Sequence, residues 1–187
     1  MPRIPGGHAP QTKPALRRQV REARRRRLAT ADRAAEARAV AAAVLDAFDP
    51  GLLVAAYEAL PTEPPTDALV QALLARGVRV VVPLLLADLD LDWRLAGGSA
   101  ALGVHAVGDA RLVIVPALAV DTAGTRLGQG GGSYDRALAR RSPAATVVAV
   151  VNDEEYVEGP LPREPHDARV DAVVTTGGAV HRTGQPG

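Results

Sequence analysis

Two stretches, Arg111-Leu-Val-Ile-Val115 and Thr146-Val-Val-Ala-Val-Val151, decide the fold class, because both are short and strongly apolar. Runs of this kind are typical of strands that are buried on both faces of a sheet. Working outward from them, the sequence predicts further strands at Leu52–Tyr57, Arg79–Leu86, Ala172–Thr176 and, at a sheet edge, Asp88–Leu95.

Helical patterns separate these runs. Apolar residues at helical spacing predict helices over Pro14–Leu28, from near Asp32 to the turn Asp49-Pro50-Gly51, over Asp67–Arg76 and over Ser133–Arg141. Strands that alternate with helices are joined by right-handed crossovers, so the sheet should be mostly parallel and covered on both faces. We therefore predict a three-layer α/β/α fold with an open, Rossmann-like sheet.

Length and composition limit the class of protein. A chain of 187 residues fits one domain, which we place at 12–177, between a mobile tail at 1–11 and a frayed end at 178–187. The absence of cysteine excludes a disulfide scaffold, a cysteine zinc site and a thiolate nucleophile. Because the net charge is only +1, no global field attracts nucleic acid or an anionic membrane. With no apolar run of about 18 residues and no signal-peptide centre, we expect a soluble, cytoplasmic monomer without membrane or nucleic-acid partners.

The most unusual segment runs from Asp121 to Asp135 and places four glycines within five positions, just before a predicted helix. Glycines remove side-chain obstruction, so that backbone N–H groups can converge on one anion. The following helix N-terminus and Arg126 add positive charge. These features predict a phosphate-binding loop. A flexible turn is the alternative, but a turn requires neither Arg126 nor the Tyr134-Asp135 pair.

Two familiar phosphate loops do not fit this segment. A Walker-type loop needs Gly-Lys-Ser/Thr, and the segment has no lysine. A dinucleotide fingerprint needs three glycines directly after a strand, whereas Gly128 and Gly130 are followed by Ser133, and about ten residues separate Val115 from Gly128. Asp153 does lie near the distance expected of a ribose-binding carboxylate, so this alternative is weakened but stays open.

Lys13 is the single lysine among 22 basic residues. Arg17 lies one helical turn after it, on the same face. A compact ammonium at one position points to a specific need for it, although chance survival explains it equally well on composition alone.

The segment from Val115-Pro-Ala-Leu-Ala-Val-Asp121 to Arg126-Leu-Gly-Gln-Gly-Gly-Gly-Ser-Tyr-Asp-Arg136 resembles the signature of the 5-formyltetrahydrofolate cyclo-ligase family, also called methenyltetrahydrofolate synthetases. Further resemblances follow the family order and together reach from Lys13 to Thr176. They are Lys13-Pro-Ala-Leu-Arg17, the Tyr57–Thr66 loop with Pro61-Thr62-Glu63, and Leu161-Pro162 with His166-Asp167 and Val170-Asp171.

The resemblance implies a NagB/RpiA/CoA-transferase-like variety of the fold and an ATP-dependent ligase. ATP and 5-formyltetrahydrofolate would be its substrates, 5,10-methenyltetrahydrofolate, ADP and phosphate its products, and Mg²⁺ its metal. It implies that Arg126 and Tyr134 are catalytic and that Asp135 and Asp167 hold the metal. It assigns ATP binding to Lys13, Arg17, Arg126, Leu127, Gly128, Gln129, Gly130, Gly131, Gly132, Ser133 and Tyr134. It assigns folate binding to Arg17, Glu63, Gln129, Gly130, Gly131, Gly132 and Ser133.

Several residues also have plainer interpretations. Asp135 fits a helix N-cap and Glu63 a solvated loop residue. Tyr134 would serve equally as a loop anchor, and Trp93 either lines the folate cavity or packs in the core. Ser133 replaces the aromatic residue that many family members carry, which bears on folate specificity.

Two rival functions remain. Seven arginines between Arg17 and Arg27 suggest a nucleic-acid-binding module, although a solvated helix face is the commoner explanation and no aromatic residues interleave with them. The second rival is a non-catalytic protein of the same fold that binds a nucleotide or a sugar phosphate. A hydrolase is disfavoured, since the chain has no Gly-x-Ser-x-Gly elbow.

Overall fold

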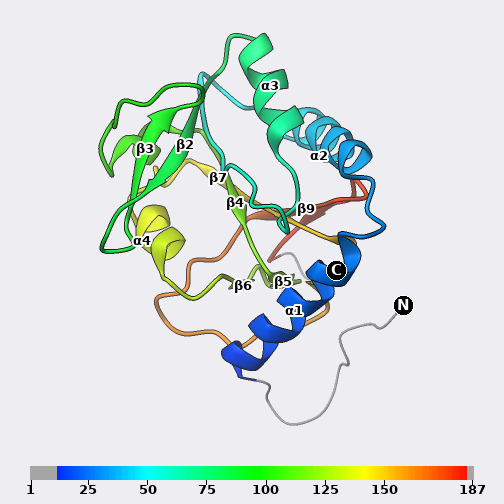
Figure 1. Ribbon diagram of the computed structural model, residues 1–187. Coiled ribbons are helices and arrows are strands. Elements are labelled where there is room, and N and C mark those ends of the chain that lie inside the picture. The colour runs from blue at the N-terminus through cyan, green and yellow to red at the C-terminus, as the bar shows by residue number, and fades with distance from the viewer. Residues whose placement is uncertain (1–11, 185–187) are drawn as a thin grey trace.

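The computed structural model describes residues 12–184, so the predicted tail at 1–11 and the last three residues lie outside the described part. A seven-stranded sheet forms the centre of the molecule, in the order β10-β9-β7-β4-β1-β2-β3 (Figure 1). Its strands are β1 (Leu53–Ala55), β2 (Arg79–Leu85), β3 (Leu91–Leu95), β4 (Leu112–Pro116), β7 (Thr146–Val151), β9 (Ala172–Thr175) and β10 (Val180–Arg182).

The five central strands β9, β7, β4, β1 and β2 are parallel, and the two edge strands β10 and β3 are antiparallel. The strand period of two sends alternate residues into opposite cores. In β4, for example, Val113 and Val115 enter one hydrophobic cluster, and Leu112 and Ile114 enter the other. This double burial explains why the central strands are uninterrupted apolar runs, and it confirms the predicted α/β sheet.

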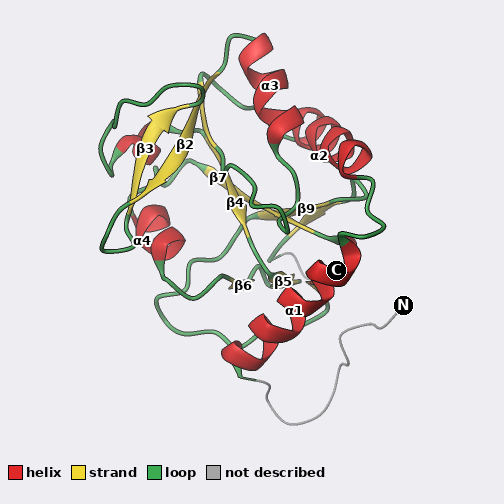
Figure 2. Cartoon of the chain, in the orientation of Figure 1, coloured by secondary structure: helices red, strands yellow, loops and turns green. Residues whose placement is uncertain are grey.

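Helices cover both faces of the sheet (Figure 2). The helices α2 (Arg33–Ala47) and α3 (Asp67–Ala75) contribute residues to one cluster. The short α4 (Ser133–Ala139) and the 3₁₀ turn η1 (Ala106–Asp109) contribute to the other. Asp32 is the N-cap of α2, where its carboxylate accepts a hydrogen bond of 3.0 Å from the backbone N–H of Ala35. No described helix is both long and apolar enough to cross a membrane.

A second, small sheet is absent from the sequence predictions. It consists of β5 (Ala119–Asp121), β6 (Arg126–Leu127) and β8 (Tyr156–Val157), in the order β6-β5-β8, and β8 follows the 3₁₀ turn η2 (Asp153–Glu155). The first helix, α1 (Lys13–Arg27), packs Leu16 and Val20 onto this sheet. The small sheet therefore holds α1 beside the segment that carries the glycines.

The described C-terminal end also differs from its prediction. A frayed end was expected over 178–187, yet Val180–Arg182 form β10 and pair with β9. The register joins Val180 to Val174 and Arg182 to Ala172. The strand Val180-His-Arg182 is partly exposed and has no apolar run. Its strand conformation therefore depends on pairing with β9 rather than on a pattern in its own sequence.

Candidate active site

One cavity of about 380 Å³ lies beyond the carboxyl ends of β1 and β4, where Tyr57 and Pro116 form part of its wall. Sheets of this type bind ligands at that edge. Every residue that the sequence assigned to ATP, folate or metal lines this cavity: Lys13, Arg17, Glu63, Asp167 and the whole run from Arg126 to Asp135. The fold thus brings four segments that are distant in sequence to a single site.

The glycine loop adopts a backbone that side chains would disturb. Gly130 has φ +109°, and a Cβ there would lie 3.3 Å from the guanidinium of Arg17. Gly132, with φ +69°, is the N-cap of α4 in the left-handed conformation. Arg17 extends from α1 to this loop, where its Nε donates a hydrogen bond of 2.9 Å to the carbonyl oxygen of Gly128. The helix and the loop therefore form one wall of the cavity.

Arg126 is 6% exposed and forms an ion pair with Asp135, in which Nη2 lies 2.8 Å from Oδ1. Its Nε is buried without a hydrogen-bond partner among the described residues. The Tyr134 ring lies 5.9 Å from the guanidinium carbon. A buried cation with an unused donor is suited to receive an anion in the cavity.

Lys13 forms a second ion pair in the wall of the cavity. Its Nζ lies 2.6 Å from Oδ2 of Asp167 and 3.2 Å from Oε2 of Glu164. Burial opposes the charged ammonium, but the hydrogen bonds to Asp167 and Glu164 outweigh burial and raise the pKa of Lys13. Burial likewise opposes the Asp167 carboxylate, and the hydrogen bonds from the Glu164 backbone and from Lys13 outweigh it and lower the pKa of Asp167. Both groups stay ionised at neutral pH.

The two carboxylates predicted to hold a metal face the same cavity. The backbone N–H of Ala168, the residue after Asp167, lies 3.3 Å from Oδ1 of Asp135. Ligand atoms of Glu164, His166 and Asp167 also lie within 4.8 Å of one another. Carboxylate oxygens beside a phosphate-binding loop are the donors that Mg²⁺ prefers, so the residues present fit that ion. The helix N-cap interpretation of Asp135 does not hold, because Gly132 is the N-cap of α4.

Glu63 lines the same cavity and is 4% exposed, so it is not a solvated loop residue. One carboxylate oxygen accepts a hydrogen bond of 3.0 Å from the backbone N–H of Leu60, and the other accepts one of 3.3 Å from the Gln129 amide. Among the described residues, no Lys, Arg or His nitrogen lies within the 4.0 Å of an ion pair. A buried carboxylate of this kind has capacity for further donors.

The loop that carries Glu63 is held in place by side chains. The Tyr57 hydroxyl donates to the carbonyl of Pro64 over 2.8 Å, and the Thr66 hydroxyl donates to the carbonyl of Tyr57 over 2.6 Å.

The pKa of Tyr134 in the cavity is raised, first by burial and then by the negative charge of Glu63, while the positive charge of Arg126 opposes the shift. Tyr134 is therefore a neutral hydrogen-bond donor in the cavity rather than a base.

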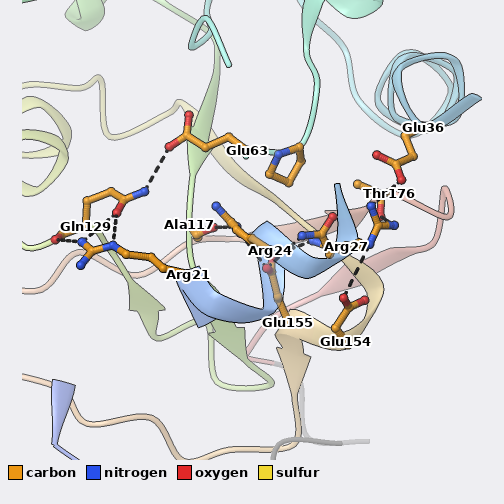
Figure 3. A network of polar contacts seen from close by, with 12 residues as sticks. Arg21, Arg24, Arg27, Glu36, Glu63, Ala117, Gln129, Glu154, Glu155 and Thr176 are labelled. Carbon is orange, nitrogen blue, oxygen red and sulfur yellow. Dashed lines mark hydrogen bonds and ion pairs between the residues drawn. The ribbon is translucent and has the colours of Figure 1, made fainter. Parts of the chain in front are cut away.

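The structure decides between the two alternatives for Trp93 in favour of core packing, and it replaces the simplest interpretation of the arginine run. Trp93 is 1% exposed and packs in a core cluster, outside the residues that line the cavity. The arginine run is not simply a solvated face, because Arg24 is 3% exposed and pairs with Glu155, with 2.7 Å between Nε and Oε1 (Figure 3). Other arginines of this run bind the protein itself, including Arg27, which pairs with Glu36.

The apolar wall of the cavity was not predicted from the sequence. Leu60, Pro83, Leu85 and Leu91 line it beside the polar groups. Leu85 and Leu60 are 65% and 58% exposed, as expected of residues at an open mouth. No local pattern distinguishes such leucines from ordinary strand or loop residues, so only the folded chain reveals them.

The comparisons with known proteins agree with this geometry. Residues 9–176 match the 5-formyltetrahydrofolate cyclo-ligase family. The chain is 34% identical over 186 residues to the 5-formyltetrahydrofolate cyclo-ligase of Mycolicibacterium smegmatis (strain ATCC 700084 / mc(2)155), covering 89% of this chain and 95% of that protein. A shorter match, 40% identical over 78 residues, is to the mitochondrial 5-formyltetrahydrofolate cyclo-ligase of Arabidopsis thaliana and covers 37% of this chain and 28% of that one.

Two solved structures share the fold. The 5,10-methenyltetrahydrofolate synthetase of Aquifex aeolicus has a TM-score of 0.72 at 25% identity, covering 94% of this chain and 95% of that one. The 5,10-methenyltetrahydrofolate synthetase of Mycoplasma pneumoniae has a TM-score of 0.69 at 19% identity, covering 87% of this chain and 98% of that one. Because the family match spans nearly the whole chain and its characteristic residues share one cavity, the chain belongs to the 5-formyltetrahydrofolate cyclo-ligase family and is a ligase.

Proposed function

We propose that this enzyme converts 5-formyltetrahydrofolate to 5,10-methenyltetrahydrofolate while ATP is cleaved to ADP and phosphate. The observation that carries the proposal is the composition of one cavity. The cavity contains two groups of residues: cations and a glycine loop suited to phosphate, which we call the phosphate end, and the buried carboxylate of Glu63 with its hydrogen-bond partners, which we call the folate end. Two substrates of different chemistry can therefore meet inside a single site.

ATP is needed because a formamide oxygen is a poor leaving group. In the proposed reaction the formyl oxygen attacks the γ-phosphorus, the bond to the ADP oxygen breaks, and ADP departs. N10 of the same folate then attacks the formyl carbon, the carbon–oxygen bond breaks, and phosphate leaves as the N10 proton is lost. The protein must hold the reacting oxygen in line, balance the developing charge and exclude water.

The phosphate end supplies the charges for the first step. Arg126 and Tyr134 lie next to each other in the cavity and would act on the transferred group, Arg126 as a cation and Tyr134 as a neutral donor. Lys13, Arg17 and the glycine-loop backbone would hold the remaining phosphates. Lys13 and Arg126 are paired with carboxylates, so an exchange of partners would free further donors for the nucleotide, in addition to the unused Nε of Arg126.

Asp135 and Asp167 would hold Mg²⁺ in this scheme. The bound ion would neutralise phosphate oxygens and help to orient the triphosphate. As Lys13 and Arg126 move to phosphate oxygens, the two carboxylates lose their cationic partners and become free to bind the metal. We therefore expect metal and nucleotide to bind together.

Glu63 would recognise the reduced pterin. Its carboxylate would accept hydrogen bonds from the pterin amino group and a ring N–H, a pair of donors matched to two carboxylate oxygens. The leucines at the cavity mouth would cover the apolar part of the folate. Gln129, whose amide nitrogen lies 3.3 Å from Glu63, and the loop from Gly130 to Ser133 line the same cavity and would contact both substrates.

The direct test mixes the purified protein with 5-formyltetrahydrofolate, Mg²⁺ and ATP, and follows the methenyl product by near-ultraviolet absorbance and ADP by a coupled assay. Both products should appear in equal amounts, and each should require all three components. ADP release without folate, or nucleotide binding without any turnover, would instead favour the non-catalytic nucleotide-binding alternative. Gel filtration of the same sample tests the expected monomer.

A further inference from the structure

Arg21 lies on α1, outside the cavity and outside the sequence elements that resemble the family. It nevertheless forms hydrogen bonds to Gln129, which lines the cavity (Figure 3). Its Nη2 donates to the backbone oxygen of Gln129 over 2.8 Å and to the side-chain Oε1 over 2.9 Å. Its Nε donates to the same Oε1 over 3.1 Å. The guanidinium thus holds both the main chain and the side chain of Gln129.

This contact determines which end of the Gln129 amide faces the cavity. A guanidinium has only donors, so it binds the amide oxygen and leaves the amide nitrogen directed elsewhere. That nitrogen, Nε2, lies 3.3 Å from Oε1 of Glu63. A chain of contacts therefore runs from Arg21 through Gln129 to the buried carboxylate, as Figure 3 shows.

The chain of contacts matters because Glu63 has so few other partners. Its remaining hydrogen bond comes from the backbone of Leu60. A reversed Gln129 amide would present its oxygen to the carboxylate, and two acceptors would repel each other. Arg21 prevents this reversal by binding the amide oxygen. It acts on the Glu63 carboxylate only through Gln129.

We propose that Arg21 is a positioning residue for folate binding, which acts through Gln129 to orient the Glu63 carboxylate toward the pterin. The proposal rests on the proposed function of Glu63. It separates Arg21 from Arg17, one turn earlier on the same helix face, which contacts the Gly128 carbonyl and lines the cavity itself. Loss of Arg21 should consequently weaken folate binding more than ATP binding, because the side-chain amide that Arg21 orients contacts Glu63.

The test compares Arg21→Ala with Arg25→Ala, a control on the same helix whose exposed side chain has no hydrogen bond or ion pair to described residues. For Arg21→Ala we expect the KM for 5-formyltetrahydrofolate to rise about threefold to tenfold, the KM for ATP to rise less than that, and kcat to change less than about twofold. Arg21→Lys should recover only part of the loss, because an ammonium cannot bind both oxygens as a planar fork does. The control should match the wild type in all three parameters.

A double-substitution cycle separates positioning from a general structural effect. If Arg21 acts through Gln129, the Arg21→Ala/Gln129→Ala protein should bind folate no more weakly than Gln129→Ala alone. Additive losses, an equal rise in both KM values, or an unchanged folate KM in Arg21→Ala would each overturn the proposal. Calorimetric titration with 5-formyltetrahydrofolate keeps the outcomes distinct. A wild type that does not bind folate refutes the proposed function, whereas equal folate affinity of wild type and Arg21→Ala refutes the role of Arg21 alone.

Discussion

The two groups of residues in the cavity, the ion pairs of the phosphate end and Glu63 with its partners at the folate end, balance charge in opposite ways. At the phosphate end each carboxylate has a cation, since Asp167 pairs with Lys13 and Asp135 with Arg126. At the folate end Glu63 has no such cation among the described residues and relies on one backbone N–H and one amide. The cations of the first group are already paired with carboxylates, whereas the Glu63 carboxylate of the second group can accept further hydrogen bonds.

This difference determines how much each group of residues gains when a ligand binds. A buried carboxylate without a cation is less stable than a paired one, so Glu63 gains most when a ligand supplies donors. A paired site gains less, because the charge of each cation is already partly balanced by its carboxylate. We therefore expect substitutions at the folate end to reduce activity most steeply, and substitutions at the phosphate end to reveal competition between ligands.

The largest effect is expected for Glu63→Gln. The amide keeps the shape but loses the charge and turns one acceptor into a donor, so kcat/KM for 5-formyltetrahydrofolate should fall about 100-fold, on the order of two charge-assisted hydrogen bonds. Steady-state kinetics with each substrate varied in turn measures this change. The KM for ATP should stay within about twofold, and the exposed Glu22→Gln in α1 serves as the control. A similar fall for both substrates would contradict the separation of the two ends.

Lys13→Ala should reduce kcat/KM for ATP at least about tenfold, the effect of losing one charge-assisted contact. It also leaves Asp167 without its cation, which adds repulsion toward the triphosphate. Lys13→Arg should retain part of the activity because it keeps the charge. Kinetics with ATP varied at saturating folate measures the change, and wild-type values for Lys13→Ala would remove this residue from the site.

Asp135→Asn should have two effects of opposite sign. The Mg²⁺ concentration needed for half-maximal activity should rise about fivefold, because one hard ligand is lost. Without Mg²⁺, ATP should bind about threefold more tightly, since Arg126 no longer has a competing carboxylate. Calorimetric titration with ATP in the presence of a chelator measures the second effect. Weaker metal-free binding in the variant would argue against the exchange of partners.

The smallest effect concerns an ion pair that no ligand has to displace. A hydrogen bond from Arg140 holds the pKa of Asp90 at about 2, below its usual 3.8; burial opposes this shift, and the backbone N–H of Leu91 and the charge of Arg136 support it. This lowered pKa means that the pair stabilises the fold above about pH 4, and that the contribution disappears as the pH falls through about 2.

Asp90→Asn should accordingly lower Tm at pH 7 by about 2–4 °C. The difference from the wild type should narrow steadily as the pH is lowered below 4. Thermal unfolding followed by circular dichroism at several pH values measures it, with kcat unchanged at pH 7. A difference that persists undiminished at the lowest pH would show that Asp90 acts by packing rather than by charge.

Much of the fold could be predicted from the sequence, because burial of a helix or strand face fixes the spacing of its apolar residues. The strand Thr146–Val151 was predicted with its observed bounds, and the helix starting near Asp32 carries its capping residue in the chain itself. The small sheet could not be predicted in this way. Its strand Arg126–Leu127 has two residues, too few for any period, and its pairing with Ala119–Val120 depends on the tertiary structure.

For the site, the family resemblance of the sequence by itself determined which residues to expect together: the glycine loop, Lys13, Arg17, Glu63 and Asp167 belong to segments that resemble the family, and all of them line the cavity. Tertiary structure alone decided their partners. Whether an arginine is solvated or buried against a carboxylate depends on residues more than a hundred positions away, as with Arg24 and Glu155 or Arg21 and Gln129. Charge interactions act through space and have no sequence period, whereas hydrophobic burial follows the geometry of each helix or strand.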